Sequence, residues 1–194
     1  MPRRKTPQPP KQAIVLKVAL RDIEPEIWRR VQVPEHCTLD RLHRVFQMVF
    51  GWLDYHLFEF EIAGRRFEAP DEDAEFEDAS KADLRSLKLK EGDRFQYVYD
   101  FGDNWIHDCT VERMVSIDDE WQLFPQLLDG QLAGPHEDCG GPYGYSDLRE
   151  ALSDPNHPQH KDMRDWVGPH YNPDRFDPWM ANQNLILAAA WGKI

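Results

Sequence analysis

Apolar and polar side chains alternate in two short stretches near the start of the chain. Ile14, Leu16, Val18 and Leu20 stand at every second position, and the segment 27–33 repeats this alternation after a short turn. Alternation with a period of two places one face of a strand against a core, and a short connection favours a hairpin. The sequence therefore predicts two antiparallel strands at the beginning of the fold.

The next segment has its apolar residues at helical spacing. Every third or fourth position is apolar, at Leu39, Leu42, Val45, Phe46, Val49 and Phe50. Thr38 is a residue type that caps helix N-termini, and Gly51 is one that ends helices. The pattern predicts a helix over 38–50 with one buried face.

Three later strands are indicated by shorter alternations at 58–62, 94–101 and 105–115. The strand 94–101 is aromatic on one face, and the turn residues 102–104 connect it to its neighbour. The acidic stretch 68–83 has almost no side chain to bury, so we expect a solvated, mobile loop there.

After residue 115 proline and glycine indicate a long irregular connection, followed by helices expected at 146–152, 158–167 and 178–190. This order predicts an α+β fold. The expected arrangement is a β-grasp-like roll, made of a hairpin, a helix across a mixed sheet and an aromatic hairpin, with a helical C-terminal third. We expect a disordered basic leader at 1–12, the α+β domain at 13–167 and a C-terminal helical extension at 168–194.

Acidic side chains outnumber basic ones, 35 to 23, which gives a net charge of −12. Proteins bind duplex DNA mainly through lysine and arginine, so a broad duplex-binding surface is not expected. Arg29, Arg30, Arg41 and Arg44 lie close together in the sequence. They form either a local basic patch or the solvated faces of a strand and a helix.

The sequence also bears on location. No apolar run approaches the roughly 18 residues that span a bilayer, and the basic start lacks the apolar segment of a signal peptide. The cysteines at 37, 109 and 139 form neither an even set nor a C-x-x-C pair, which is typical of reduced thiols. These observations predict a cytoplasmic protein that does not bind membranes.

His56, His107 and Cys139 form the candidate metal site, because imidazole and thiolate are the usual ligands of zinc. Cys109, Glu137 or Asp138 could each supply a fourth ligand. The spacing of these residues is not a compact zinc motif. Both histidines therefore also fit hydrogen-bonded positions in or beside the core. Cys139 also fits the role of a nucleophile, although neighbouring carboxylates oppose its ionisation.

Five ordered motifs give the chain a resemblance to a known family. They lie at 27–34, 38–43, 50–60, 99–107 and 137–142. In this order they resemble the plasmid pRiA4b ORF-3-like family, whose members are also described as insertion-element passenger proteins of a "TnpR family". The residues that carry the resemblance include Trp28, Arg29, Arg30, Asp100, Gly102, Asp103, Trp105, Glu137, Asp138, Gly140 and Gly141.

The resemblance implies a compact α+β domain associated with plasmids or transposable elements, without an established activity. A serine resolvase, which the "TnpR" label implies, needs an activated serine among arginines and a basic DNA-reading module. The sequence contains neither. Many family members carry a second cysteine a few residues before the motif at 137–142, near the position where Gly134 stands here.

Two hypotheses of function follow. No coherent catalytic set is visible, which favours a non-enzymatic accessory domain of mobile elements that binds a protein partner or a local nucleic-acid feature. The alternative is a zinc-dependent enzyme, such as a hydrolase or nuclease, that uses His56, His107 and Cys139.

Overall fold

A single mixed sheet forms the centre of the molecule. The structure is a computed structural model that describes residues 12–71, 74–117, 124–190 and 194. The strands are β1 (Gln12–Leu20), β2 (Trp28–Pro34), β3 (Phe58–Ile62), β4 (Arg65–Glu68), β5 (Glu77–Asp78), β6 (Arg94–Tyr99), β7 (Trp105–Ser116) and β8 (Gln126–Gln131). They are arranged in the order β5-β4-β3-β6-β7-β1-β2-β8, and only β4 and β5 are parallel.

The predicted N-terminal hairpin is confirmed, and it lies within the sheet. β1 pairs with β2 from Ala13↔Pro34 to Ala19↔Trp28, and its other edge pairs antiparallel with β7. Because β1 has neighbours on both sides, most of its residues are buried. This explains why the hairpin has the clearest hydrophobic pattern in the sequence.

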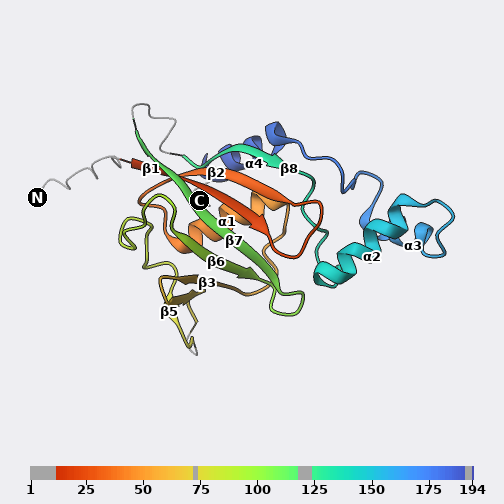
Figure 1. Cartoon of the computed structure of the whole chain (residues 1–194), viewed down its shortest axis with the longest axis horizontal. Helices are drawn as coiled ribbons and strands as arrows, with labels where there is room; N and C mark the ends of the chain where they lie inside the picture. Colours follow the sequence, from red (N-terminus) through yellow and green to blue (C-terminus); the bar gives the residue numbers. More distant parts are fainter. Residues whose placement is uncertain (1–11, 72–73, 118–123, 191–193) are drawn as a thin grey trace, which may run out of the picture.

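Helix α1 (Leu39–Phe50) lies across one face of the sheet, as the periodicity predicts (Figure 1). Gly51 ends it in a left-handed conformation with φ 86°, and its N–H donates to the carbonyl of Gln47. Thr38 occupies the N-cap position, but its side chain does not cap the helix; its hydroxyl contacts the Asp40 carboxylate instead.

An aromatic core fills the space between α1 and the sheet. Tyr97 of β6 is fully buried, and its ring contacts those of Phe46 in α1 and Phe60 in β3. Further along the same face Trp52 packs on Tyr99 and Trp105. Aromatic side chains thus supply much of the apolar area that holds α1 on the sheet.

The acidic stretch 68–83 is more structured than the sequence predicts. β5 lies within it and pairs with β4, and Ala79 is fully buried. Its carboxylates are used in turns: Glu68 accepts the N–H of Phe76, and Asp78 accepts bonds from Ser80. Acidic composition alone gave no sign of this, because β5 has no apolar alternation. Residues 72–73 lie outside the described part.

Two helices, α2 (Gly141–Ser153) and α3 (His160–Val167), extend beyond one end of the sheet (Figure 1). The expected start of α2 at Ser146 is wrong, because the helix begins five positions earlier in the glycine motif. A Cβ on Gly141 would lie 2.4 Å from the carbonyl oxygen of Asp103, and one on Gly144 would lie 1.9 Å from that of Cys139. Glycine is therefore needed for close packing of main chains.

The last helix, α4 (Pro178–Ala190), returns to the sheet, where it packs beside β8 and α1. The Asn182 amide exchanges two hydrogen bonds with the main chain of Leu127 in β8. Most of the expected extension 168–194 is thus in contact with the α+β domain. The expected leader at 1–12 lies outside the described residues except for Gln12, the first residue of β1.

None of the helices in the described ranges has both the length and the apolar character needed to cross a membrane. The cytoplasmic location remains a prediction from the sequence.

Candidate metal centre

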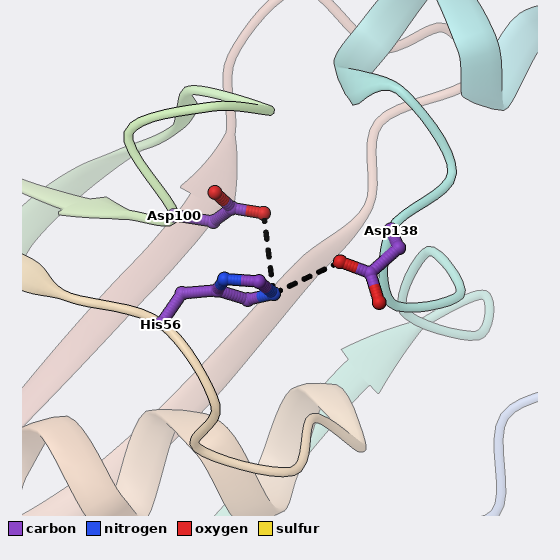
Figure 2. Close-up of side chains that lie close together, drawn as sticks. All are labelled: His56, Asp100 and Asp138. Atoms are coloured by element: carbon purple, nitrogen blue, oxygen red, sulfur yellow. Dashed lines mark hydrogen bonds and ion pairs between the residues drawn. The ribbon is translucent and has the colours of Figure 1, made fainter.

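Three side chains that are far apart in the sequence meet beside the end of β6. His56 comes from the segment between α1 and β3, Asp100 directly follows β6, and Asp138 lies in the loop before α2. One ligand atom from each lies within 4.8 Å of the other two. Figure 2 shows the imidazole of His56 between the two carboxylates. Its Nε2 is 3.0 Å from Oδ1 of Asp138 and 3.6 Å from Oδ2 of Asp100.

Asp100 is the fixed member of this cluster. It has a left-handed φ of 53°, a conformation that aspartate tolerates better than most residues. Its Oδ1 accepts the N–H groups of Gly102 at 2.9 Å and Asp103 at 3.3 Å. Its own N–H donates to the carbonyl of Leu57. The turn after β6 therefore occupies one carboxylate oxygen and leaves Oδ2 toward His56.

The loop that carries Asp138 is attached to the same turn. The N–H of Gly140 donates to Oδ2 of Asp103 at 3.0 Å, and Gly141 lies directly against the Asp103 carbonyl. Asp138 itself has a φ of 57°. Asp103 and the glycines thus fix the path of the loop and bring Asp138 to His56.

Glu137 holds the segment that carries His56, between α1 and β3, in place. Its Oε1 accepts the Leu53 N–H at 2.7 Å and the Tyr99 hydroxyl at 3.0 Å. The Tyr99 oxygen in turn accepts the N–H of Tyr55. Burial raises the pKa of Tyr99, so its hydroxyl stays protonated and remains a donor. These bonds fix the chain immediately before His56.

This arrangement suits a divalent transition metal. One imidazole nitrogen and two carboxylate oxygens are ligands that zinc and manganese accept, and three protein ligands leave positions open for water. The Asp100 side chain is 9 % exposed and that of Asp138 is 64 % exposed. The site is therefore anchored on the sheet side and open on the loop side.

The structure does not bring together the ligand set expected from the sequence, His56, His107 and Cys139. His107 is fully buried, and its ring packs against Phe50, Trp52 and Tyr97. Its Nδ1 lies 3.1 Å from the Trp105 carbonyl, which places the proton on that nitrogen. Burial lowers the pKa of His107 to about 3, so the ring is neutral. It is a core histidine, a role that its inward position on the strand also allowed.

Cys139 is also absent from the cluster found among the described residues. Burial, reinforced by Asp103, raises the pKa of its thiol to about 12. Cys109, one of the three residues expected as a fourth ligand, lies in the core beside His107. Glu137, the second of them, supports the site without belonging to it, whereas Asp138, the third, is a member of the cluster.

The arginines of the first family motif have structural roles. Arg29 is 1 % exposed and donates to the carbonyls of Val49, Trp28, Gln131 and Leu132. Burial lowers the pKa of Arg29 to about 9. Arg30 forms a two-bond ion pair with Glu112, and the Trp28 indole donates to Gln131. A basic patch that includes Arg29 is therefore excluded.

A second polar network was not visible in the sequence. His43 of α1 lies between the Tyr97 hydroxyl at 2.7 Å and the Asp54 carboxylate at 2.6 Å. Burial lowers the pKa of His43, so a neutral ring donates to Asp54 and accepts from Tyr97. Residues 43, 54 and 97 share no motif, and only the tertiary fold brings them together.

The fold and the histidine–aspartate cluster define a small α+β protein whose glycine loop closes over the end of its sheet. The chain belongs to the plasmid pRiA4b ORF-3-like protein family, whose sequence model matches residues 12–180. The resemblance drawn from the five ordered motifs is confirmed. The family is one of plasmid-associated proteins without a characterised activity.

Two relatives cover nearly the whole chain. The uncharacterized protein y4hQ of Sinorhizobium fredii (strain NBRC 101917 / NGR234) is 38 % identical over 189 residues, which are 92 % of this chain and 93 % of that protein. The crystal structure of MM3350, a protein of unknown function from Methanosarcina mazei Go1, has a TM-score of 0.78 and 35 % identity. The match covers 87 % of this chain and 97 % of that one. The α+β fold is thus shared with an experimental structure.

Proposed function

We propose that this protein is a non-catalytic accessory module of plasmids and mobile elements, and that a divalent metal at His56, Asp100 and Asp138 fixes its binding surface. The observation that carries the proposal is the convergence of three ligand atoms within 4.8 Å. A metal bound there would join Asp138 of the loop before α2 to His56 and Asp100 through strong bonds. These bonds would add to the hydrogen bonds by which Glu137 and Gly140 already hold this loop at the sheet end.

The surroundings of the site favour a protein partner over nucleic acid. Leu53, Tyr55 and Leu57 flank His56 in sequence and are 58 %, 69 % and 63 % exposed. Exposed apolar side chains gathered on one segment are typical of protein-binding surfaces. Asp54 and Asp138 add negative charge, which repels phosphate. The guanidinium of Arg29 is bonded to main-chain carbonyls and that of Arg30 to Glu112, so neither is free to bind phosphate.

Metal content is the test of this proposal. Protein purified and then equilibrated with Zn²⁺ or Mn²⁺ is passed through a desalting column and analysed by elemental mass spectrometry. We expect about one ion per wild-type chain. His56→Ala and Asp100→Asn should retain far less metal, because the loss of a ligand should weaken affinity at least tenfold. The exposed His170 provides a matched control, and His170→Ala should retain the metal. Equal metal content in all four proteins would overturn the proposal.

A metal-dependent hydrolase is the second candidate, because three protein ligands leave room for a metal-bound water. In this form the ligands are His56, Asp100 and Asp138, in place of the set with His107 and Cys139. The activated phosphodiester bis(p-nitrophenyl) phosphate is a suitable probe. Hydrolysis that requires added metal and disappears in Asp100→Asn would favour the enzyme. Its absence in the metal-loaded wild type would favour the accessory module.

A further inference from the structure

A second site lies on the other side of Glu137, in a cleft of about 320 Å³ between the end of α1, the segment 133–137 and the start of α4. Met48, Phe176 and Ala181 contribute apolar walls. This volume is at the lower end of the range found for small-molecule sites, which are mostly apolar with a few polar groups. The cleft is separate from the metal ligands, none of which lines it.

Four charged side chains line the cleft, and two of them have their bonds within the fold. Arg29 makes four hydrogen bonds to main-chain carbonyls, and its guanidinium lies 3.7 Å from the centre of the Phe176 ring. Asp177 accepts the N–H groups of Trp179 and Met180 at the beginning of α4. These two residues build the walls of the cleft.

The other two charged groups have unused hydrogen-bonding capacity. Glu137 is 8 % exposed, and within the described part of the chain its Oε2 is buried without a partner. A buried polar atom without a partner is costly, and in a native protein it indicates a bound water, ion or ligand. Arg175 lies exposed in the wall of the same cleft, and no ion pair joins it to the described carboxylates.

We propose that this cleft binds a small zwitterion with an apolar side group, of the amino-acid class. Binding exposes Oε2 of Glu137 to the cleft, where it accepts a hydrogen bond from the ammonium group. The carboxylate of the ligand pairs with the guanidinium of Arg175, and the side group packs against Met48 and Ala181. A simple amine satisfies only Glu137 and is repelled by the two arginines. A simple carboxylate satisfies only Arg175 and is repelled by Glu137.

Calorimetric titration with three molecules of one carbon skeleton tests this inference. L-leucine carries both charges, 3-methylbutylamine carries only the ammonium group, and 4-methylpentanoate carries only the carboxylate. We expect leucine to bind the wild-type protein at least tenfold more tightly than either analogue. An amine that binds as tightly as leucine, or a wild type that binds none of the three, would overturn the proposal.

Two variants locate the binding. Glu137→Gln keeps an oxygen for Leu53 and Tyr99 but removes the charge, and Arg175→Gln changes an exposed side chain that the fold does not need. Each should weaken leucine binding at least tenfold, whereas Arg113→Gln, an exposed arginine on β7, should leave it unchanged. Circular dichroism verifies that each variant is folded. Unchanged leucine binding in both cleft variants would overturn the assignment. Because the probes are metal-free, failure here is distinct from failure of the metal site.

Discussion

The Nε2 atom of His56 lies 3.0 Å from Oδ1 of Asp138, although 82 positions separate the two residues. This contact joins the segment between α1 and β3 to the glycine loop before α2. Asp100, at 3.6 Å from the same nitrogen, completes a cluster at the end of the sheet. Three loops that differ in sequence and position therefore converge on one atom, and the surrounding core and turns hold them there.

His107 should make the stability of the protein depend on pH. Its pKa is lowered to about 3 in the fold, against 6.5 in the unfolded chain, so below pH 6.5 the unfolded state binds the additional proton. The free energy of unfolding should fall by about 1.4 kcal/mol for each pH unit from about 6 toward 3 because of this group. Urea denaturation of wild type and His107→Gln between pH 7 and 5 measures it.

The difference between the two pH slopes is the informative quantity, because His43 and the carboxylates are common to both proteins. His107→Gln should lose this part of the slope even if it is less stable at pH 7. Parallel slopes would contradict the placement of a neutral His107 in the core.

Arg29 should be far more important for stability than the neighbouring Arg30. Arg29→Met removes the donor from one buried and three partly buried carbonyls, and each unsatisfied buried group costs roughly 1–3 kcal/mol. We expect a loss of about 3–5 kcal/mol, reduced where water reaches a carbonyl. Arg30→Met removes a partly exposed ion pair worth about 0–1 kcal/mol. Similar denaturation midpoints for the two variants would refute this assignment.

Gly134 is predicted to reject any side chain. An added Cβ would lie 2.0 Å from the carbonyl oxygen of Phe50, which is main chain and cannot turn aside. Gly134→Ala should therefore cost about 2–3 kcal/mol through overpacking. Gly102→Ala is the comparison variant, because its Cβ would lie 3.2 Å from a carboxylate oxygen of Asp100, a contact that a shift of a few tenths of an ångström relieves. A thermal melt of each variant gives the comparison, and equal losses would show that packing at Gly134 is not limiting.

Cys139 should react slowly with thiol reagents. A pKa of about 12, against 9.0 for the unperturbed thiol, lowers the thiolate fraction about a thousandfold at neutral pH. Alkylation with iodoacetamide at about pH 8, followed by peptide mass mapping, should label Cys139 in urea-unfolded protein long before it does so in the folded protein. Rapid labelling of the folded protein would restore Cys139 as a candidate nucleophile.

The sequence was most informative where one periodicity covered a complete element. The apolar face of α1 and the alternation of β1 predicted both elements because each pattern continues from one end of its element to the other. β8 was missed because it lies at the edge of the sheet, where only Leu127 is buried and Gly130 interrupts the pattern. The start of α2 was missed because Gly141 and Gly144 are typical of turns, and only the close approach of other main chains shows why a helix needs them.

The candidate site was predictable in part. His56 and Asp138 stood among the residues expected as ligands, and Asp100 belonged to a family motif. Their grouping depends on hydrogen bonds made by Asp103 and Glu137 across the fold, which no local pattern encodes. Alternation correctly placed the His107 side chain on the inward face of its strand. The sequence did not show that this face is packed with aromatic rings, which makes His107 a core residue and not a ligand.

The most direct measurement of the central claim is anomalous X-ray diffraction from crystals equilibrated with Zn²⁺. We predict one strong peak about 2.0–2.3 Å from Nε2 of His56 and from a carboxylate oxygen of each of Asp100 and Asp138. A peak on Cys139 or His107, or no peak at the His56 cluster in crystals grown at millimolar zinc, would contradict it.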